Sequence, residues 1–467
     1  MYKDIHIYHI NDLHSHFKNW PQTQRFMNEQ KHFHEEKDED VLFFDLGDFM
    51  DRSHPLTEAT DGRANVNMMD SLPLNAVTIG NNEGIGNRKD VLNHLYDRAD
   101  FPVVVANLFD EETGKRPDWA EPWLVLKTKN DMRVGIVGLT APLYLSYLPN
   151  GWVPKESDDV LPKILAELRS KSDFIILLSH MGIREDERLA KRYPEFDVIL
   201  GAHTHHVLPE GDMIKDTLLT GGGKWGQYIG HTVISHIKGQ VKNKSTELIA
   251  CTNLPQEKED LNRVNQLRQK GNNLLAKQEI ATIPFTFRTD WLFATDLVYL
   301  GLDAICDYAC SEIGILNSGL FLEDLPAGTV TKETIHRILP HPMRLMVCRM
   351  TGQAFKALIW GMEEMRHNLL TRPVTGMGFR GKIFGELVYK GIEVNQEEAL
   401  IYHQGLPIRD DQLIEFVTVD HYRYISFFPL IEEKGSIKLL TPYFLREIFS
   451  LYLNKQYPIS ENNEVKV

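Results

Sequence analysis

The chain has 467 residues, and its 51 Lys and Arg against 65 Asp and Glu give a formal charge of −14. Hydrophobic residues make up 42% and charged residues 25%, which are ordinary globular values, so the length predicts several domains with real cores and excludes disorder over most of the chain. An acidic chain repels phosphate backbones, which disfavours a nucleic-acid polymer as the main partner. A small anionic substrate remains compatible if a local cation offsets the field.

Neither membrane insertion nor a disulfide framework is expected. No apolar run reaches the roughly 18 residues that a membrane span needs. The first residues lack the basic start, apolar core and cleavage site of a secretory signal. The four cysteines, Cys251, Cys306, Cys310 and Cys348, are too few and too scattered for a disulfide framework. We therefore expect a cytoplasmic protein that does not bind membranes.

The first half of the chain predicts a layered α/β domain. Short apolar runs that read as strands recur at residues 5–10, 41–46, 76–79, 103–106, 134–139, 174–178 and 198–200. Polar stretches with helical spacing separate several of them, for example at 159–170. The acidic run at 35–40 is interpreted as a solvated helix end and turn. Alternation of strands and helices is typical of sheets covered by helices.

A change in composition divides the chain into domains. Residues 256–278 are rich in Lys, Glu, Asn and Gln with leucines at helical spacing, which predicts an exposed linker helix. We expect a first domain at 1–255, the linker helix at 256–280, a second domain at 281–457 and a polar tail at 458–467. Within the second domain, helical material is expected at 297–310 and strands at 344–350, 382–389 and 413–419.

Metal-competent side chains follow five of the predicted strands of the first half. These residues are Asp12 and His14, Asp48, Asn81, His180, and His203 with His205. In an open α/β sheet, ligands bind at the carboxyl ends of strands, so these side chains are expected to converge. Taken singly, His180 could be a core histidine, and His203 and His205 could be loop residues. Five such coincidences together are a much weaker explanation than a shared site.

The chemistry of these side chains suits divalent metal ions. Carboxylates, an amide oxygen and imidazoles favour Zn, Mn, Fe or Co over Ca, which prefers oxygen alone. The ligands outnumber those of one tetrahedral ion, so two ions bridged by a carboxylate are expected. Such a pair activates water near neutral pH and clamps both oxygens of a displacement at phosphorus. Divalent ions would also allow an acidic protein to hold a phosphate ester.

These blocks resemble, in order, the D-x-H, G-D, G-N-H-[DE], H and G-H-x-H motifs of calcineurin-like metallophosphoesterases. Residues 4–430 are also similar to the bacterial 5′-nucleotidase family, which includes UDP-sugar hydrolases and 2′,3′-cyclic-nucleotide phosphodiesterases. Ile313-Gly314-Ile315-Leu316-Asn317-Ser318-Gly319 resembles its I-G-x-x-N-x-G block. The resemblance implies an α/β fold: a four-layer αββα metallophosphoesterase domain followed by a smaller α+β 5′-nucleotidase C-terminal domain that binds the substrate.

The resemblance also divides the ligands between the ions. Asp12, His14 and His205 would hold the first metal, and Asp48 would bridge. Asn81, His180 and His203 would hold the second metal.

One departure from the family lies at the centre of the predicted site. Where the family has G-N-H-E, this chain has Gly80-Asn81-Asn82-Glu83. Asn82 replaces a histidine that stabilises the transition state or protonates the leaving group. An amide donates a hydrogen bond but cannot act as an acid, and general acid catalysis is typically worth about 10²–10⁴ in rate. His16, His54 and His206 are possible substitutes.

A second departure concerns the substrate domain. No arginine follows Asn317, and the late G-G-D-G-Y turn of the family is replaced by residues 424–429. By position, Phe379 and Phe428 could clamp a base, and Arg344 and Arg380 could contact phosphate or sugar. Both phenylalanines could equally belong to the core.

The sequence therefore predicts a metal-dependent phosphoesterase of the 5′-nucleotidase type, whose substrate is a small phosphate ester of the nucleotide class. The expected mechanism is in-line attack on phosphorus by a metal-bound hydroxide, with Asp48 and Asn82 as catalytic residues. Three alternatives stay open: a 2′,3′-cyclic nucleotide phosphodiesterase, a nucleotide-sugar hydrolase, and a weakly active nucleotide sensor in which Asn82 limits turnover.

Overall fold

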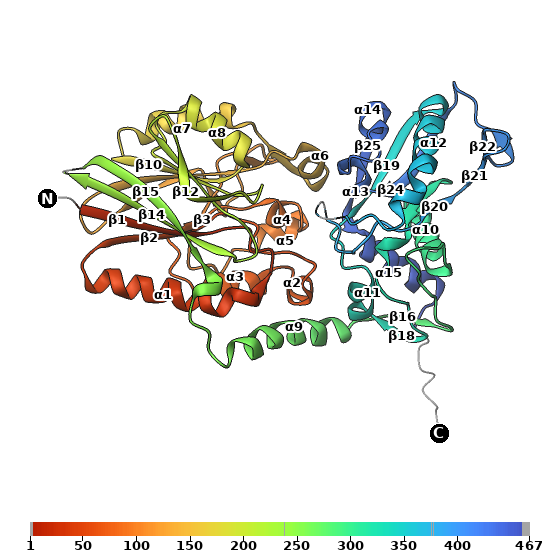
Figure 1. Ribbon diagram of the computed structural model, residues 1–467, viewed down its shortest axis with the longest axis horizontal. Coiled ribbons are helices and arrows are strands. Elements are labelled where there is room, and N and C mark those ends of the chain that lie inside the picture. Colours follow the sequence, from red (N-terminus) through yellow and green to blue (C-terminus); the bar gives the residue numbers. More distant parts are fainter. Residues whose placement is uncertain (1–2, 238, 375, 377, 460–467) are drawn as a thin grey trace. The chain divides into compact units, whose positions relative to one another are not determined.

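The computed structural model describes residues 3–237, 239–374, 376 and 378–459, and the chain divides into two compact units (Figure 1). The first unit is Met1–Gly271 and the second is Asn272–Val467. Helix α9 (Asp260–Ala276) occupies most of the stretch predicted as the linker helix and crosses this division. Of the predicted polar tail, residues 460–467 lie outside the described residues.

Two sheets form the centre of the first unit. The first sheet has the order β15-β14-β1-β2-β3-β4-β6. Its strands are β15 (Gln240–Ala250), β14 (Tyr228–Ile237), β1 (Lys3–Ile10), β2 (Asp40–Asp45), β3 (Ala76–Val77), β4 (Val103–Val104) and β6 (Ala120–Glu121). β1 pairs in parallel with β2, which pairs in parallel with β3, whereas β14 runs antiparallel to β1. The parallel strands are thus aligned so that β1 and β2 end at the same edge.

The second sheet has the order β12-β13-β11-β10-β8-β7. Its strands are β12 (Val207–Ile214), β13 (Thr217–Gly222), β11 (Val198–Gly201), β10 (Phe174–His180), β8 (Arg133–Thr140) and β7 (Trp123–Lys127). β10 pairs in parallel with both β8 and β11. Every residue of β10 and β11 is buried, as expected for strands that are covered on both faces.

Helices cover the outer faces of the two sheets, which gives four layers. Ile7, Phe44 and Ile176 belong to the apolar layer between the sheets. On the outer face of the first sheet, Tyr8 and Phe43 pack with α1 (Trp20–Glu36) and α3 (Arg63–Met69). On the outer face of the second sheet lie α7 (Ser157–Leu168) and α8 (Ile183–Arg192). The predicted αββα arrangement is therefore correct.

Shorter elements complete the first unit. They are α2 (Pro55–Thr60), α4 (Asn81–Gly84), α5 (Lys89–Asn93), α6 (Tyr144–Tyr147), β5 (Leu108–Asp110), β9 (Trp152–Pro154) and three short 3₁₀ turns at Phe17–Asn19, Leu148–Asn150 and Cys251–Asn253.

The second unit is α+β and is built on a five-stranded sheet of order β20-β17-β24-β19-β25. Its strands are β20 (Leu387–Lys390), β17 (Gly314–Asn317), β24 (Leu413–Val419), β19 (Arg344–Thr351) and β25 (Ser436–Phe444). The helices are α10 (Asp296–Ala309), α11 (Lys332–Ile338), α12 (Gly352–Leu369), α13 (His421–Tyr424), α14 (Leu430–Lys434) and α15 (Leu445–Gln456). Smaller elements are β16 (Glu279–Ile283), β18 (Gly328–Thr331), β21 (Ile392–Asn395), β22 (Leu400–His403), β23 (Leu406–Pro407) and the turn Ser318–Leu320.

The predicted strand at 382–389 is wrong in its first half, because β20 begins only at Leu387. Gly385 has a φ of +84°, which is outside the range of an extended strand. A Cβ atom at Gly385 would lie 2.6 Å from Oγ of Ser318, so the chain here passes tightly against the turn after β17. Alternating apolar residues indicated a strand, but the glycine interrupts it.

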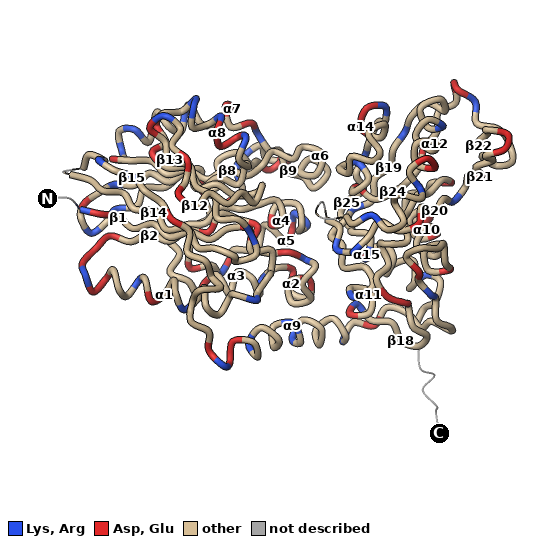
Figure 2. Tube along the Cα trace, in the orientation of Figure 1, with Lys and Arg blue, Asp and Glu red and all other residues tan. Residues whose placement is uncertain are grey.

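Charged residues of both signs are spread over both units (Figure 2). Among the helices of the described residues, none combines the length and apolar character needed to cross a membrane.

Candidate metal centre

Five of the predicted ligands of the first unit have an unusual backbone conformation, with positive φ angles. Asp12, His14, Asp48, His203 and His205 have φ values of 48°, 50°, 53°, 72° and 59°. This left-handed region is uncommon for residues other than glycine and disfavoured by the Cβ atom. Such conformations persist where the surrounding structure enforces them, and they cluster at functional sites. We name the seven predicted ligands, Asp12, His14, Asp48, Asn81, His180, His203 and His205, the strand-end centre.

Asp12, His14 and His205 form the first group of ligand atoms. Oδ1 of Asp12 lies 3.4 Å from Nε2 of His205 and 3.7 Å from Nε2 of His14. The two Nε2 atoms of His14 and His205 are 3.2 Å apart. One ligand atom from each residue lies within 4.8 Å of the others, a spacing at which one cation can contact all three.

Asp48, His180 and His203 form the second group, with the same spacing of ligand atoms. Oδ2 of Asp48 lies 3.4 Å from Nε2 of His180. The same oxygen lies 3.7 Å from Nε2 of His14, which belongs to the first group. Asp48 therefore stands between the two groups, where a bridging carboxylate has to be.

Several ligand atoms are buried without any hydrogen-bond partner among the described residues. They are Oδ1 of Asp12, Oδ1 of Asn81 and Nε2 of His180. An unsatisfied buried polar atom costs about 1–3 kcal/mol, so three of them at one place need an explanation. A carboxylate oxygen, an amide oxygen and an imidazole nitrogen are suitable ligands for divalent transition metals. The residues present therefore fit divalent metal ions.

The ring of His180 is fixed in the form that a metal ligand needs. Its Nδ1 lies 2.7 Å from the carbonyl oxygen of Leu46, so this nitrogen carries the proton and donates it. A metal ion would take the place of the second proton on Nε2, which faces Asp48, and the ring would then be neutral. Metal-bound histidines usually donate their other ring N–H in this manner.

Two residues whose roles the sequence did not predict support the ligands. Nδ2 of Asn11 donates to Oδ2 of Asp12 at 2.8 Å and to the carbonyl of Gly223 at 2.7 Å. Oε2 of Glu83 accepts the backbone N–H groups of Asp48 and Gly80, at 2.9 and 2.8 Å. The three-residue spacing of Gly80 and Glu83, a carboxylate that returns to the start of a short helix, was the available signal.

Glycines allow the loops of the centre to approach one another closely. A Cβ atom at Gly80 would lie only 2.0 Å from Oδ1 of Asp48. Gly47 has a φ of +89°, and a Cβ atom there would lie 2.2 Å from the backbone nitrogen of Gly80. The position of Asp48 therefore depends on the absence of side chains at both neighbours.

The carboxylates make the centre attractive to positive charge. Burial would raise the pKa of Asp48, but the charges of His180 and His14 lower it below its usual range. Burial would lower the pKa of His180, but the charges of Asp48 and Asp12 outweigh this and raise it to about 10. Burial lowers the pKa of His203 to about 4, so this ring is neutral. Burial, with the charge of Asp48, raises the pKa of Glu83 to about 7.

Asn82 lies against a predicted ligand. Its backbone N–H donates to Oδ1 of Asp48 at 2.8 Å, and its side-chain nitrogen Nδ2 is 2.6 Å from Nδ1 of His14. For His14 to offer Nε2 to a metal, Nδ1 has to carry the proton, and the amide of Asn82 then has to be turned by about 180° so that its oxygen accepts this proton. The amide therefore contacts the ligand His14.

The three histidines considered as substitutes for the family histidine have other contacts. His16 stacks on Trp225, with ring centroids 5.2 Å apart. His54 accepts a hydrogen bond from the backbone of Leu56 at the start of α2. His206 is exposed and lies 2.9 Å from Oγ1 of Thr204.

In the second unit, the two phenylalanines considered for base stacking are core residues. Phe379 is 3% exposed and its ring stacks between His341 and His421, at centroid distances of 5.2 and 5.4 Å. Phe428 is 2% exposed and stacks on Tyr422. Both faces of the Phe379 ring are thus already covered, which is the core role that the sequence left open beside base stacking.

The polar candidates of the second unit also make internal contacts. The amide of Asn317 donates to the carbonyl of Phe384 and accepts from the hydroxyl of Tyr422. The guanidinium of Arg344 is buried 4.6 Å from the ring centre of Phe444. Nη1 of Arg380 donates to the carbonyl of Phe379. Contacts of these residues with a substrate stay predictions.

Comparisons with known proteins agree with this architecture. Residues 5–207 match the family model of the calcineurin-like phosphoesterases, and residues 276–379 match that of the 5′-nucleotidase C-terminal domain. The metallophosphoesterase YunD of Bacillus subtilis is 32% identical over 96% of this chain and 99% of its own length. A 5′-nucleotidase of Vibrio cholerae is 24% identical over 67% of this chain and 66% of its own length.

A solved structure shares the fold over both units. The NAD nucleotidase NadN of Haemophilus influenzae aligns with 98% of this chain and 97% of its own, with a TM-score of 0.65 at 14% identity. At this identity the likeness concerns the fold alone. The identity with YunD and the two family models together carry the assignment: the chain belongs to the calcineurin-like phosphoesterases that have a 5′-nucleotidase C-terminal domain, and it is a phosphoric ester hydrolase.

Proposed function

We propose that the protein hydrolyses phosphate esters of nucleotides and that the strand-end centre holds two divalent metal ions for this reaction. The observation that carries the proposal is the pair of ligand groups around Asp48. Asp12, His14 and His205 supply one group, and Asp48, His180 and His203 supply the other. Oδ2 of Asp48 lies within 3.7 Å of a histidine nitrogen from each group. One ion per group, with Asp48 shared, accounts for this arrangement.

Two bound divalent ions would supply Lewis acidity that activates water and offsets the negative charge on the phosphoryl oxygens. The chain's own contribution is to hold the ligands in place before the substrate arrives. The carbonyl of Leu46 orients His180, and Asn11 orients Asp12. Prepositioned charges and dipoles of this kind need little reorganisation during the reaction.

Asn82 is proposed as a positioning residue. With the amide turned so that its oxygen faces His14, this oxygen would accept the proton of His14 Nδ1 and keep Nε2 available as a ligand. A hydrogen bond from Asn82 to a phosphoryl oxygen would require the amide to leave His14. Because an amide cannot protonate a leaving group, we expect esters with good leaving groups to react faster than alkyl esters.

The nucleotide class of substrate rests on the relatives. The 5′-nucleotidase of Vibrio cholerae and the NAD nucleotidase of Haemophilus influenzae both bear nucleotide substrates in their names. A panel of substrates tests the class, with the protein reconstituted in Mn²⁺ or Co²⁺. It contains nucleoside 5′-monophosphates, 2′,3′-cyclic nucleotides, UDP-glucose and p-nitrophenyl phosphate. The expected result is a lower KM for a nucleoside monophosphate than for p-nitrophenyl phosphate, whose better leaving group favours its kcat. If the protein prefers a cyclic diester or UDP-glucose, we would instead assign that compound class as its substrate.

A weakly active sensor is the second candidate, and the amide of Asn82 favours it. The variant Asn82→His separates the two. A large gain in turnover with every nucleotide would show that Asn82 limits catalysis and would favour the sensor. No gain, with an efficient natural substrate already found for the wild type, would favour the enzyme.

A further inference from the structure

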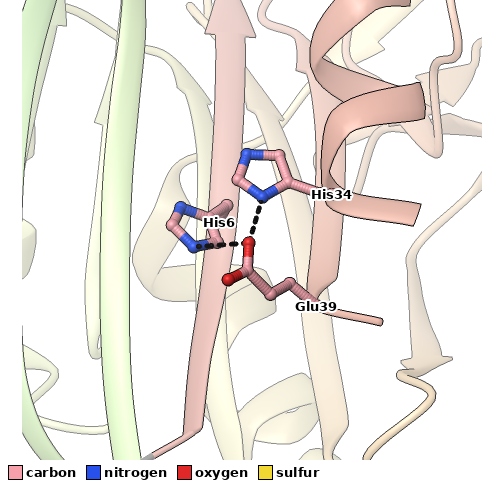
Figure 3. Close-up of side chains that lie close together, drawn as sticks. All are labelled: His6, His34 and Glu39. Carbon is pink, nitrogen blue, oxygen red and sulfur yellow. Dashed lines mark hydrogen bonds and ion pairs between the residues drawn. The ribbon is translucent and has the colours of Figure 1, made fainter. Parts of the chain in front are cut away.

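A second group of potential ligands lies on the outer face of the first sheet, away from the strand ends. His6 is on β1, His34 is in the last turn of α1, and Glu39 lies in the turn between α1 and β2 (Figure 3). None of these residues belongs to the strand-end centre. One ligand atom from each lies within 4.8 Å of the others. We name these three residues the helix-end cluster.

The local fold brings the members of the helix-end cluster together. Asp38 has a left-handed backbone, with φ of 55°, which ends the helix and reverses the chain. The backbone N–H of Glu39 then donates to the carbonyl of His34 at 2.9 Å. This turn brings Glu39 back toward the helix, so Glu39 is half-buried, whereas residues 35–38 of the acidic run are exposed, as the sequence suggested.

The carboxylate oxygen of Glu39 is the common point of the cluster. Oε2 of Glu39 lies 2.8 Å from Nδ1 of His34 and 3.8 Å from Nε2 of His6. The two imidazole rings stack with their centroids 4.0 Å apart. Figure 3 shows both rings directed at the same oxygen atom.

A chain of hydrogen bonds determines which nitrogen of His6 carries its proton. Nδ1 of His231, on the neighbouring strand β14, lies 2.9 Å from a carboxylate oxygen of Glu247 and donates its proton there. Nε2 of a neutral His231 is then an acceptor, and it lies 3.0 Å from Nδ1 of His6. His6 therefore carries its proton on Nδ1, and the lone pair of its Nε2 is directed toward Glu39.

A similar chain acts on His34. The hydroxyl of Tyr8 donates to Oε1 of Gln30 at 2.9 Å, so its oxygen accepts from Nε2 of His34 at 3.1 Å. Nδ1 of a neutral His34 then bears a lone pair, and this nitrogen is 2.8 Å from Oε2 of Glu39. In this tautomer both histidines direct lone pairs at a carboxylate, an arrangement that is repulsive unless a positive charge lies among the three.

A proton or a metal ion could supply that charge, and the geometry favours the metal ion. A proton on Nδ1 of His34 would join only the pair at 2.8 Å and would leave Nε2 of His6 without a donor. A single cation among the three atoms satisfies all of them.

We propose that His6, His34 and Glu39 bind one divalent ion of the Zn²⁺, Co²⁺ or Ni²⁺ class, separate from the ions of the strand-end centre. Zn–N and Zn–O bonds of about 2.0–2.2 Å place tetrahedral ligands about 3.4 Å apart. On binding, Nδ1 of His34 and Oε2 of Glu39, which are 2.8 Å apart, would therefore separate, and Nε2 of His6, which is 3.8 Å from the same oxygen, would move closer to it. Each histidine donates its other ring N–H to a fixed acceptor, which is the usual support of a metal-binding histidine. The side chains of His6 and Glu39 are 16% and 37% exposed, so water can complete the coordination. The ion would tie the end of α1 to β1.

The test compares retained metal in variants of the full chain. Wild type, Glu39→Gln and His34→Gln are loaded with Zn²⁺, dialysed against metal-free buffer and assayed by elemental analysis. The controls are Glu36→Gln and His32→Gln, which change exposed residues of the same helix. We expect Glu39→Gln and His34→Gln to retain one equivalent fewer than wild type, and the controls to equal wild type. Equal retention in all five proteins would overturn the proposal and assign an ordinary ion pair to Glu39 and His34.

The test measures the difference in retained zinc between each variant and wild type, so the result does not depend on how many ions the strand-end centre holds. Phosphatase activity of Glu39→Gln is expected to equal that of wild type, which separates this site from the proposed function. If a variant does not fold, crystals of the wild type grown with Zn²⁺ decide the matter. An anomalous peak among the three ligand atoms is expected at the zinc edge, and its absence would contradict the proposal.

Discussion

The strand-end centre of the first unit and the stack around Phe379 in the second unit both bury histidines, but they use them differently. In the centre, Nε2 of His180 is buried with no hydrogen-bond partner among the described residues, and five ligands adopt left-handed backbone. In the stack, His341 and His421 cover the two faces of an apolar ring. His341 also accepts from the backbone of Arg380 through Nδ1.

The difference shows how a binding site can be told from a core in a structure without ligands. A core places polar atoms where other protein atoms satisfy them, because each unsatisfied one is costly. A binding site keeps lone pairs available and holds backbone in strained conformations to do so. By the left-handed backbone of five of its ligands, the strand-end centre has the character of a binding site, whereas Phe379 and Phe428 are packed among other rings.

Removing the charge of Asp48 should break the centre most severely. The variant Asp48→Asn keeps the shape of the side chain but loses the carboxylate shared by both ligand groups. We expect kcat to fall by about 10³-fold or more, at least the loss seen when a single preorganised stabilising group is removed. Phosphatase assays and circular dichroism measure it. Asp90→Asn, at an exposed position, is the control; activity of Asp48→Asn close to that of this control would remove the bridging role.

Truncating Phe379 should reveal a core residue. Phe379→Ala is expected to lower the free energy of unfolding by about 3–5 kcal/mol, as for other buried phenylalanines. The KM measured below the melting transition should stay near that of wild type. Chemical denaturation and steady-state kinetics provide the two readouts, with exposed Phe293→Ala as the control. A large rise in KM with unchanged stability would restore base stacking to Phe379.

Adding one methyl group beside Asp48 should disturb the centre in a graded manner. In Gly80→Ala the new Cβ atom would overlap Oδ1 of Asp48, so the carboxylate has to move. Misplacement of a reacting group by about 1 Å costs up to about 10²-fold in rate, and we expect a loss of that order. In the matched variant Gly361→Ala, the added Cβ has no neighbour within 4 Å. This control should be fully active and about 0.4–1 kcal/mol more stable. Full activity of both variants would show that the approach of Gly80 to Asp48 is not required.

The smallest effect is expected at Asn82. Asn82→Asp keeps an oxygen acceptor for His14 Nδ1, whereas Asn82→Ala removes it. Asn82→Ala should lower activity at limiting Mn²⁺ by about 10-fold, the low end for residues that orient metal ligands. Excess Mn²⁺ should restore part of the loss, and Asn82→Asp should stay closer to wild type. If excess metal restores nothing, Asn82 acts on the substrate and does not position His14.

The strand ends could be predicted because the apolar runs at 174–178 and 198–200 lead directly into Ser179-His180 and into Gly201-Ala202-His203. The parallel sheet then brings His180 and His203 to one edge. Strands β12 and β15 are not among the predicted strands, because their exposed positions break the apolar runs. β13 is buried, but four of its six residues are Thr or Gly, so no apolar run marks it. Since β14 supplies His231, no sequence spacing could connect it with His6 or with the end of α1. The burial of Phe379 between His341 and His421 likewise depends on packing that no sequence pattern reveals.

Elemental analysis combined with activity tests the central claim most directly. The protein is stripped with a chelator until it is free of transition metals, assayed with its best phosphate ester, and assayed again after addition of Mn²⁺ or Co²⁺. We predict a folded but inactive protein that regains activity as the strand-end centre fills. A preparation shown to be free of metal that hydrolyses the ester at the full rate would contradict the account.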